Sequence, residues 1–375
     1  MTTGPVCVVG AGPAGSMAAL GLSAAGVACQ LLERNTEPKN KVCGEFLSPE
    51  AVARLDALSF PWLQAGATPV RHVRIESHGA TVGMPLPFEA LSVSRCFLDA
   101  WLLGQAKGRG VDVQTGVHVK DVVRTETAFE LRTSDGGLQV KTLVLATGKQ
   151  ALGRFHPRTG ADGASLVGWK MNFDHVGAAL AEALRETLGL FFFDGGYGGI
   201  SVEGEGTLTV SLLVLPAVLV QAGDEPLGLL RAIAPGVPLL QMVLRESQPV
   251  WDRPKTVSNL PYGHCDQETQ AGLFAVGDQF AVLPSFTGTG ISFAMASGSL
   301  AAEHIAAGLP ACAYAVEARA MARKVLRRAL PLHRWLPKPA FARVAMWALR
   351  WAPPLLPWVA RTTRVPALKK AKSAA

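Results

Sequence analysis

The sequence predicts an α/β fold with an α+β insert and a helical C-terminal tail, and three observations support this prediction. Residues 6–34 read as strand, Gly-rich loop, helix and strand, which is typical of a βαβ unit. Residues 273–307 return to a buried strand, a second Gly-rich loop and a second helix. Between them, residues 166–260 have mostly strand-like periodicity. A first domain in separate segments, interrupted by a sheet-based second domain, accounts for this order.

Short apolar runs and residues that start or stop helices mark the elements of the first domain. Gly26 ends the first helix, and Ser48 followed by Pro49 is typical of a helix start. Asp135-Gly136-Gly137 separates two alternating runs and predicts a β-hairpin. The expected elements are strands at Val6–Val9, Ala28–Leu32, Arg71–Ser77, Val111–Val123, Phe129–Thr133, Leu138–Val140, Thr142–Ala146 and Leu273–Val276, and helices at Ser16–Ala25, Ser48–Leu58, Ser94–Gly108 and Gly288–Ala307.

The second domain is expected to contain a sheet with a few helices. Its predicted strands are Val167–Phe173, Leu190–Phe193, Ile200–Glu203 and Thr207–Leu215, and its predicted helices lie near Ala178–Leu188 and Leu227–Glu246. We assign residues 1–75, 92–163 and 262–310 to the first domain, residues 76–91 and 164–261 to the second, and residues 311–375 to the tail.

The composition excludes several classes of protein. Hydrophobic residues make up 49% of the 375 residues and charged residues only 17%, so the chain can bury a large core and is not disordered. The six cysteines are scattered, which gives neither a disulfide framework nor zinc-ligand spacing and fits a reducing compartment. We therefore expect no metal site. Because no secretory signal precedes the first strand, we expect a cytoplasmic protein.

A Gly-rich motif follows the first strand. Gly10-Ala11-Gly12-Pro13-Ala14-Gly15 fits G-x-G-x-x-G, and the N-terminus of the helix behind it attracts phosphate. Gly10 allows the tight turn, Gly12 lets a pyrophosphate approach the backbone, and Gly15 lets the helix pack on the strand. Glu33 ends the next strand, where a carboxylate can bond ribose hydroxyls and repel a 2′-phosphate. The Gly-rich motif and Glu33 together predict a dinucleotide site that fits NAD or FAD.

The segment after the later buried strand favours a flavin over NAD. Gly277 and Asp278 follow this strand directly, and the carboxylate is well placed to bond the ribityl hydroxyls of a flavin. Pro284 and Gly288-Thr289-Gly290 then open a second helix. The free backbone N–H groups of its first turn suit the pyrimidine edge of a flavin ring.

Together these motifs resemble those of FAD-dependent oxidoreductases of the p-hydroxybenzoate hydroxylase fold, which implies a Rossmann-like FAD-binding domain and a substrate domain. Lys41-Val42-Cys43-Gly44-Glu45 is similar to a segment of the geranylgeranyl-reductase-related branch, which holds flavin monooxygenases, halogenases and reductases. The resemblance implies that Arg95 lies near the FAD pyrophosphate and Gly148 in a third FAD-binding segment. The residues expected to bind FAD are Gly10, Gly12, Pro13, Ala14, Gly15, Glu33, Arg34, Lys41, Cys43, Gly44, Arg95, Val119, Gly148, Gly277, Asp278, Pro284, Gly288, Thr289 and Gly290.

The resemblance leaves the reaction open among three kinds. Only Trp169 occurs where tryptophan-type halogenases carry W-x-W-x-I-P, which disfavours that class. Prenyl reductases carry Y-x-W-x-F-P over the substrate cavity, whereas Gly195-Gly196-Tyr197-Gly198-Gly199 looks more like the hydroxylases. We therefore expect a monooxygenase that uses O₂, through a flavin C4a-hydroperoxide, on a lipophilic aromatic or polyketide-like secondary metabolite. The alternatives are an FAD-dependent reductase of prenyl double bonds and a flavin-binding protein without catalysis.

Three residues are candidates for catalysis. No second G-x-G-x-x-G is present for a nicotinamide cofactor, and the resemblance implies either that NADH or NADPH binds transiently or that a partner reduces the flavin. Cys43 either carries a stabilised thiolate or fills space beside FAD. Lys170 alternates with Asn172 and His175 along a strand, so these side chains face either the substrate cavity or solvent, with solvent favoured for His175. Tyr197 lies among glycines that let a ligand approach, or it packs under a turn.

The C-terminal tail carries the positive charge of the chain. Residues 319–375 contain 14 Lys/Arg, no Asp or Glu, and four of the eight Trp, while the whole chain has a formal net charge of +7. Helical spacing interrupted by prolines such as Pro331 predicts short amphipathic helices. Such helices suit peripheral contact with the inner membrane face, or they cover a channel for a lipophilic substrate. Nucleic acid is not an expected partner, because no recognisable binding fold accompanies this charge.

Overall fold

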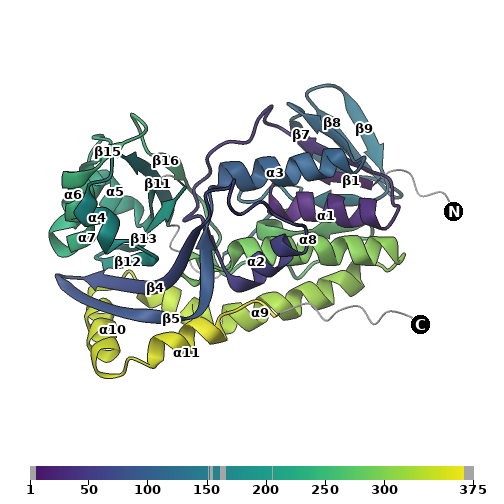
Figure 1. Ribbon diagram of the computed structural model, residues 1–375. Helices are drawn as coiled ribbons and strands as arrows, with labels where there is room; N and C mark the ends of the chain where they lie inside the picture. Colours follow the sequence, from purple (N-terminus) through teal and green to yellow (C-terminus); the bar gives the residue numbers. More distant parts are fainter. Residues whose placement is uncertain (1–5, 151, 153–154, 161–165, 205, 367–375) are drawn as a thin grey trace.

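The computed structural model describes residues 6–150, 152, 155–160, 166–204 and 206–366. Figure 1 shows two sheet-based regions side by side, with the C-terminal helices running beneath both of them. The predicted α/β fold with a sheet-based insert and a helical tail is confirmed.

The first domain is built on a parallel sheet whose strand order, among the described residues, is β17-β10-β1-β2-β6. Alternate residues of β1 face opposite sides: Val6 and Val8 pack on helices, whereas Cys7 and Val9 pack on a small antiparallel sheet. All four are buried because both faces of the sheet are covered. The strands are β1 Val6–Val9, β2 Cys29–Glu33, β6 Asp112–Thr115, β10 Leu143–Leu145 and β17 Leu273–Ala275, and the small sheet holds β7 Val119–Arg124, β8 Phe129–Thr133 and β9 Gly137–Val140.

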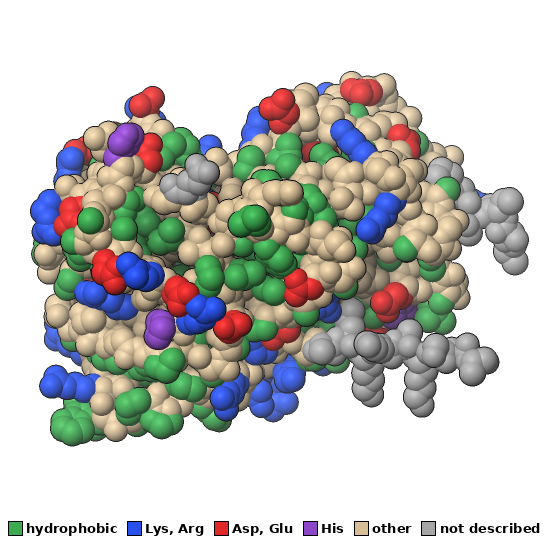
Figure 2. Space-filling model, in the orientation of Figure 1, with side chains coloured by type: hydrophobic (Ala, Val, Ile, Leu, Met, Phe, Trp, Pro, Cys, Tyr) green, Lys and Arg blue, Asp and Glu red, His purple; other side chains and the backbone are tan. Residues whose placement is uncertain are grey.

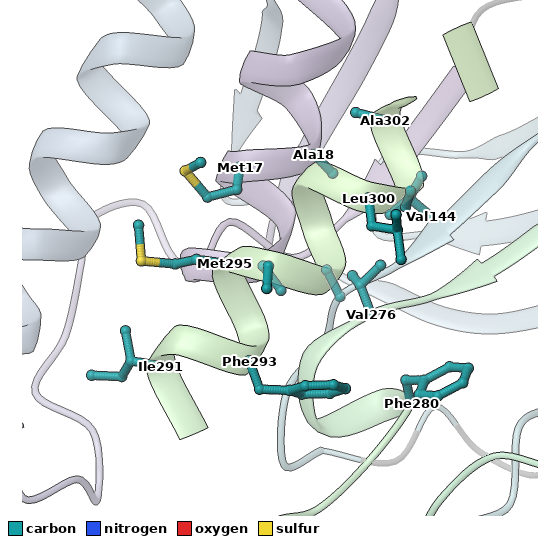
Figure 3. Packing of buried hydrophobic residues seen from close by; sticks show 14 of the residues in the cluster. Met17, Ala18, Val144, Val276, Phe280, Ile291, Phe293, Met295, Leu300 and Ala302 are labelled. Carbon is teal, nitrogen blue, oxygen red and sulfur yellow. The ribbon is translucent and has the colours of Figure 1, made fainter. Parts of the chain in front are cut away.

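Helices from both ends of the first domain pack on this sheet. Pro13, at the first position of α1, has the fixed φ that a helix start requires. Figure 3 shows Met17 and Ala18 of α1 in one cluster with Met295 and Leu300 of α8. The helices of this domain are α1 Pro13–Ala24, α2 Pro49–Asp56, α3 Arg95–Gly108 and α8 Gly290–Ala306, and short 3-10 turns cover Gly277–Gln279 and Ser285–Thr287.

The second domain is built on a mixed sheet, whose strands among the described residues run in the order β15-β11-β14-β13-β12-β4-β5-β3, with β16 also paired to β11. One face packs on α4, α6 and α7, and the other faces the C-terminal helices. The strands are β3 Phe46–Leu47, β4 Thr68–Ser77, β5 Ala80–Ser92, β11 Val167–Asp174, β12 Thr187–Phe193, β13 Gly196–Glu203, β14 Thr207–Val214, β15 Gln248–Pro249 and β16 Lys255–Val257, and the helices are α4 Ala178–Ala183, α5 Pro216–Gln221, α6 Gly228–Ile233 and α7 Pro238–Glu246, with a 3-10 turn at Ala234–Gly236.

Several elements differ from the sequence prediction. The helix predicted to reach Leu188 ends at Ala183, because the chain turns there into β12 and pairs with β4 in the sheet. The helix predicted over Leu227–Glu246 is divided at Pro235 and Pro238 into α6, a 3-10 turn and α7.

The tail also differs in one helix. Helix α9 (Ala311–Trp335) continues through Pro331, where a break was predicted, because its buried face still packs on the core and only the last turn follows the proline. Helices α10 (Pro339–Trp351) and α11 (Leu355–Thr362) complete the tail. Within the described ranges, no helix is both long and apolar enough to cross a membrane.

Two boundaries of the predicted domains stay predictions. The boundary between residues 163 and 164 and the end of the tail after residue 366 lie outside the described residues. The boundary placed after residue 75 falls inside β4, and β4 belongs to the second sheet from Thr68 onward. The chain therefore crosses into the second sheet earlier than the sequence indicated, because β4 is paired along its length with β5.

Glycines set the distance between α1 and α8, which gives a stability prediction. A Cβ added at Gly298 would lie 2.1 Å from the carbonyl oxygen of Ala14, whereas one added at Gly104, exposed on α3, meets nothing within 4 Å. We expect Gly298→Ala to destabilise the fold by about 1–3 kcal/mol through overpacking. Gly104→Ala is the matched control and should be neutral or stabilising by up to about 1 kcal/mol. Denaturant unfolding checks both, and equal effects would contradict the packing argument.

Candidate functional site

One cavity of about 950 Å³ extends between the two sheets and the C-terminal helices. It runs from the Gly-rich loop after β1, past the ends of β10 and β17, to the inner side of α10 and α11. The predicted FAD-binding residues on its wall are Gly10, Gly12, Pro13, Ala14, Glu33, Arg34, Lys41, Cys43, Gly44, Arg95, Val119, Gly148, Gly277, Asp278, Gly288 and Gly290. Residues from stretches that lie far apart in the chain thus share one space.

Three of the predicted FAD residues lie behind this wall. A Cβ at Gly15 would approach the carbonyl oxygen of Gly10 to 1.8 Å, so this position serves the packing of helix on turn. The carbonyl oxygen of Pro284 accepts a hydrogen bond of 2.8 Å from the hydroxyl of Thr287. Thr289 is buried and its hydroxyl bonds that of Thr287 at 2.6 Å. These residues shape the second Gly-rich loop from behind.

The loop after β1 forms an open cradle. Gly10 has a φ of +103°, and a Cβ there would lie 2.5 Å from the carbonyl oxygen of Ala146, so no other residue fits the turn without strain. At Gly12 a Cβ would meet nothing nearer than the cationic groups of Arg95 and Lys41, each 4.0 Å away. The backbone at Gly12 is therefore accessible, and it faces positive charge.

Glu33 is fixed at the edge of this cradle. One carboxylate oxygen accepts a hydrogen bond of 2.9 Å from the backbone N–H of Ala11. The other oxygen accepts bonds from the backbone and side-chain nitrogens of Asn35, at 3.0 and 2.7 Å. The carboxylate thus has a set orientation at the end of β2, which suits recognition of ribose hydroxyls.

Two cations beside the cradle share one carboxylate, a feature that sequence reasoning missed. Asp99 is buried and accepts bonds from Lys41 at 2.9 Å and from Arg95 at 3.1 and 3.0 Å. A single negative charge leaves one positive charge over, and an anionic pyrophosphate can balance it. The Arg95–Asp99 spacing of four residues on a helix was the available signal.

The far end of the cradle is tied together by two further residues that the sequence analysis did not select. Arg158 donates to the carbonyl oxygens of Gly148 at 3.0 Å and of Asp278 at 3.1 Å. Gln279 donates to the carbonyl oxygens of Gly148 and Gln150, both at 2.7 Å. These bonds hold the segment after β10 against the segment after β17, so both predicted FAD segments keep their place.

The Lys41–Glu45 segment forms the wall between the cradle and the second sheet. Cys43 is partly exposed on this wall, and its sulfur accepts a bond of 3.4 Å from the backbone N–H of Glu45. The carbonyl oxygen of Gly44 accepts a bond of 2.9 Å from the hydroxyl of Ser201. A Cβ at Gly44 would lie 3.1 Å from the hydroxyl of Ser211, so the segment lies close against the sheet.

Behind this segment lies a buried polar cluster of Glu45, Lys170, Asn172, Glu203 and Thr209. Lys170 is paired with Glu45, and Asn172 donates to Glu203 at 2.8 Å. The hydroxyl of Thr209 donates a hydrogen bond of 2.9 Å to the side-chain oxygen of Asn172. Burial and the neighbouring Glu203 raise the pKa of Glu45 to about 9, against the opposing effect of Lys170. One ammonium group and two carboxylates are neutral together when the carboxylates share one proton.

The structure separates the three predicted catalytic residues. Cys43 and Tyr197 line the cavity, whereas Lys170 lies behind Glu45 in the buried cluster and is absent from the cavity wall. Tyr197 is buried, its hydroxyl lies 3.0 Å from Nδ1 of His333, and burial raises the pKa of this tyrosine. His175 is exposed beside Asp174, as the sequence favoured. A catalytic role for Cys43 or Tyr197 stays a prediction, and Lys170 can act only through Glu45.

Arg364 was not selected from the sequence, although it lies on the cavity wall. It donates to the carbonyl oxygens of Ala360 and Thr287, and its guanidinium lies 4.9 Å from the ring of Phe88. Its Nη1 is buried and has no hydrogen-bond partner among the described residues. This leaves one donor available beside the second Gly-rich loop.

The cradle therefore fits the phosphates and ribose of FAD on geometry as well as on motif. Residues 3–131 match the family model described as an FAD binding domain. A menaquinone reductase of Mycolicibacterium smegmatis is 36% identical over 42% of this chain and 41% of that protein. One of Mycobacterium tuberculosis is 28% identical over 80% of this chain and 75% of that protein. Digeranylgeranylglycerophospholipid reductase 2 of Methanopyrus kandleri is 27% identical over 80% of this chain and 76% of that protein.

Among solved structures, the flavin-dependent brominase Bmp2 superposes with a TM-score of 0.80, at 18% identity, over 96% of this chain and 92% of that one. At this identity the match shows the fold. Residues 3–131 thus match an FAD binding domain, and the chain as a whole has the fold of the p-hydroxybenzoate hydroxylase flavoproteins, as the motifs indicated. It is an FAD-dependent oxidoreductase.

The shared carboxylate at the cradle predicts the effect of losing one cation. Arg95→Met removes the excess positive charge, because Lys41 then balances Asp99 alone. We expect the affinity for FAD to fall roughly 10–100-fold, the cost of a lost charge-assisted hydrogen bond. Arg109→Met, exposed just after α3, is the control and should bind FAD like the native chain. Titration with FAD, followed by flavin fluorescence, measures both, and unchanged binding by Arg95→Met would argue against this site.

The buried cluster predicts a pH-dependent difference in stability. Because the pKa of Glu45 is raised to about 9 in the folded chain, the folded state keeps a proton that the unfolded state loses above about pH 4.5. The contribution of Glu45 to stability is therefore full below pH 4.5 and declines as the pH rises toward 9. Glu45→Gln stays neutral throughout, so the melting temperature of the native chain should fall relative to this variant between pH 5 and 9. A constant difference, or one of opposite sign, would disprove the shared proton.

Proposed function

We propose that this protein is an FAD-dependent reductase that saturates a carbon–carbon double bond in the prenyl chain of a lipophilic isoprenoid, with NADH or NADPH as transient reductant. The observation that carries the proposal is the single cavity that extends from the flavin cradle along the second sheet to the C-terminal helices.

The part of this cavity beyond the cradle is lined mostly by apolar side chains. Its apolar residues come from the second sheet and from the tail, and they are Val73, Ile75, Leu86, Leu188, Leu190, Phe192, Leu336, Phe341, Leu349 and Leu356. Burial of a hydrocarbon chain against such walls contributes about 0.8 kcal/mol for each CH₂ group. A prenyl chain has no hydrogen-bonding group and therefore needs no polar partner, so this apolar lining suits it.

The comparisons support reduction more directly than oxygenation. The curated relatives that match most of the chain are named as reductases of menaquinone or of a geranylgeranyl lipid, and both of these names describe isoprenoid molecules. The free donor of Arg364 would suit a carbonyl oxygen on a head group.

Saturation of a double bond requires a hydride and a proton. FAD, when bound and reduced, supplies the hydride. The chain must place a proton donor at the cavity wall, and the thiol of Cys43 is the partly exposed candidate beside the cradle. Glu45 also borders the cavity, but it is buried and its carboxylate is paired with Lys170, while its backbone N–H bonds the sulfur of Cys43, so we assign it to holding Cys43 in position.

Monooxygenation is the second candidate, and the Gly-rich segment around Tyr197 favoured it in the sequence. The structure gives these glycines a packing role: a Cβ at Gly196 or Gly198 would lie 2.4 Å from the rings of Phe193 and Phe191. The absence of large side chains there therefore reflects the core of the second domain. This weakens the reason for preferring oxygenation.

Turnover without oxygen separates the two candidates. The native chain, supplied anaerobically with NADPH or NADH and a long-chain menaquinone, is expected to yield a product that stays heavier by two hydrogen atoms after air has reoxidised any quinol, with the added atoms located in the prenyl chain by fragmentation in the mass spectrometer. A product heavier by one oxygen atom, formed only in air with substrate-dependent O₂ consumption, would establish monooxygenation instead.

The proton-donor assignment predicts a selective defect. Cys43→Ala is expected to lower the rate of double-bond reduction about 10²–10⁴-fold, the usual range for loss of a general acid. Reduction of the bound flavin by NAD(P)H should be unaffected, as stopped-flow absorbance would show. Cys96→Ala is the control, because Cys96 is also partly buried but lies off the cavity wall. Full activity of Cys43→Ala would remove Cys43 from the reaction.

A further inference from the structure

An exposed apolar face covers the end of α9 and the outer side of α10 and α11. We call it the Trp face, and its residues are Trp335, Val344, Trp347, Trp351, Leu355 and Trp358. Trp347 and Trp351 are 65% and 71% exposed, although Trp is usually one of the more buried residue types. The other four tryptophans of the chain are buried or half-buried. Exposure on this scale, concentrated in one short stretch, is typical of a surface that contacts something else.

Helix α10 is apolar on two opposite sides. Phe341, Ala345 and Leu349 line the cavity, whereas Val344 and Trp347 point outward. The inner residues repeat at four-residue spacing, which places them on one side of the helix. A helix that only covers a core needs one apolar side, so the outer side requires a separate explanation.

Positive charge surrounds the Trp face. Lys338, Arg343, Arg350 and Arg361 are exposed on the same helices. The ammonium group of Lys338 lies 4.0 Å from the ring of Trp335. No Asp or Glu follows Glu317 in the sequence, so no acidic side chain of the tail offsets this charge. Figure 2 shows blue and green side chains together along the lower edge of the molecule, over α10 and α11, without red ones among them.

Part of the cavity wall is exposed on this face, and we take this place as a mouth of the cavity. Leu355 and Trp358 are exposed to solvent, at 43% and 62%, and are also part of the cavity wall. In Figure 1 α10 and α11 lie below β4 and β5, at the outer limit of the molecule. A molecule that passes between the cavity and the outside at this point crosses an apolar, positively charged rim.

We propose that the Trp face binds the surface of an anionic lipid bilayer and that the cavity opens there toward the lipid. Exposed Trp and Leu side chains insert among the acyl chains near the headgroups, and the basic residues attract anionic lipids. The chain then takes a lipophilic substrate directly from the bilayer through the mouth at α11. This inference rests on the proposed function for the identity of the substrate, but the binding surface itself does not depend on it.

The test is flotation of the full-length flavin-loaded protein with vesicles, without substrate. The native chain should bind vesicles of phosphatidylcholine with phosphatidylglycerol at least tenfold more tightly than vesicles of phosphatidylcholine alone, and added salt should weaken the binding. The double variant Trp347→Ser, Trp351→Ser should bind at least tenfold more weakly. The double variant Arg343→Gln, Arg350→Gln should lose about fivefold for each arginine on the anionic vesicles only.

A matched control removes exposed apolar side chains elsewhere. Leu63 and Val220 are 95% and 80% exposed and belong to neither α10 nor α11, so Leu63→Ser with Val220→Ser should bind vesicles like the native chain. All variants change surface residues, and an unchanged melting temperature and flavin content will show that they are folded.

Three outcomes would overturn the proposal. They are failure of the native chain to bind anionic vesicles, equal binding by the Trp variant, and a change in oligomeric state of that variant without any vesicle binding, which would assign the Trp face to a protein partner. Because no turnover is measured, these outcomes are distinct from failure of the proposed reductase activity.

Discussion

The close approach of α1 to the turn after β1 and to α8 is the constraint on which the rest of the structure depends. At Gly15 and Gly298 there is no room for a Cβ, because the carbonyl oxygens of Gly10 and Ala14 occupy its place. This contact joins the first and the last segments of the flavin domain, which lie far apart in the sequence. Only then do Gly12 and Asp278 border one cavity, with the phosphate cradle at one end.

The buried cluster around Glu45 gives the second constraint, because it fixes the Lys41–Glu45 segment to the second sheet. Burial of two carboxylates and one ammonium group is costly, and such groups add little net stability even when they are paired. The main effect of the cluster is therefore to position the Lys41–Glu45 segment rather than to stabilise the fold. This segment carries Cys43 and forms the wall between the cradle and the apolar part of the cavity. In the proposed function, the same wall would let the reacting end of a lipophilic chain meet the flavin while its remainder lies toward the tail.

The residues of the cradle could be selected from the sequence because most of them lie in short motifs. Gly10 to Gly15 form one turn, and Glu33 ends the strand that pairs directly with β1. The buried pair of Glu45 and Lys170 could not be predicted from the sequence. These residues are 125 positions apart, and they come together only because β11 pairs within the second sheet. Lys170 was accordingly placed at the cavity or in solvent, and Asp99, Arg158 and Arg364 were not selected. Helix α9 continues through Pro331 because tertiary packing outweighs a local preference.

The central claim is that one cavity brings a flavin and a long isoprenoid molecule together for reduction. The most direct measurement is to reduce the purified flavoprotein without oxygen, add a long-chain menaquinone in anionic vesicles, and follow the visible absorbance of the flavin. The account predicts that the oxidised absorbance returns in the absence of oxygen, at a rate that depends on the menaquinone concentration, and that the lipid afterwards carries two added hydrogen atoms in its prenyl chain. If the flavin stays reduced until air is admitted, the claim is contradicted.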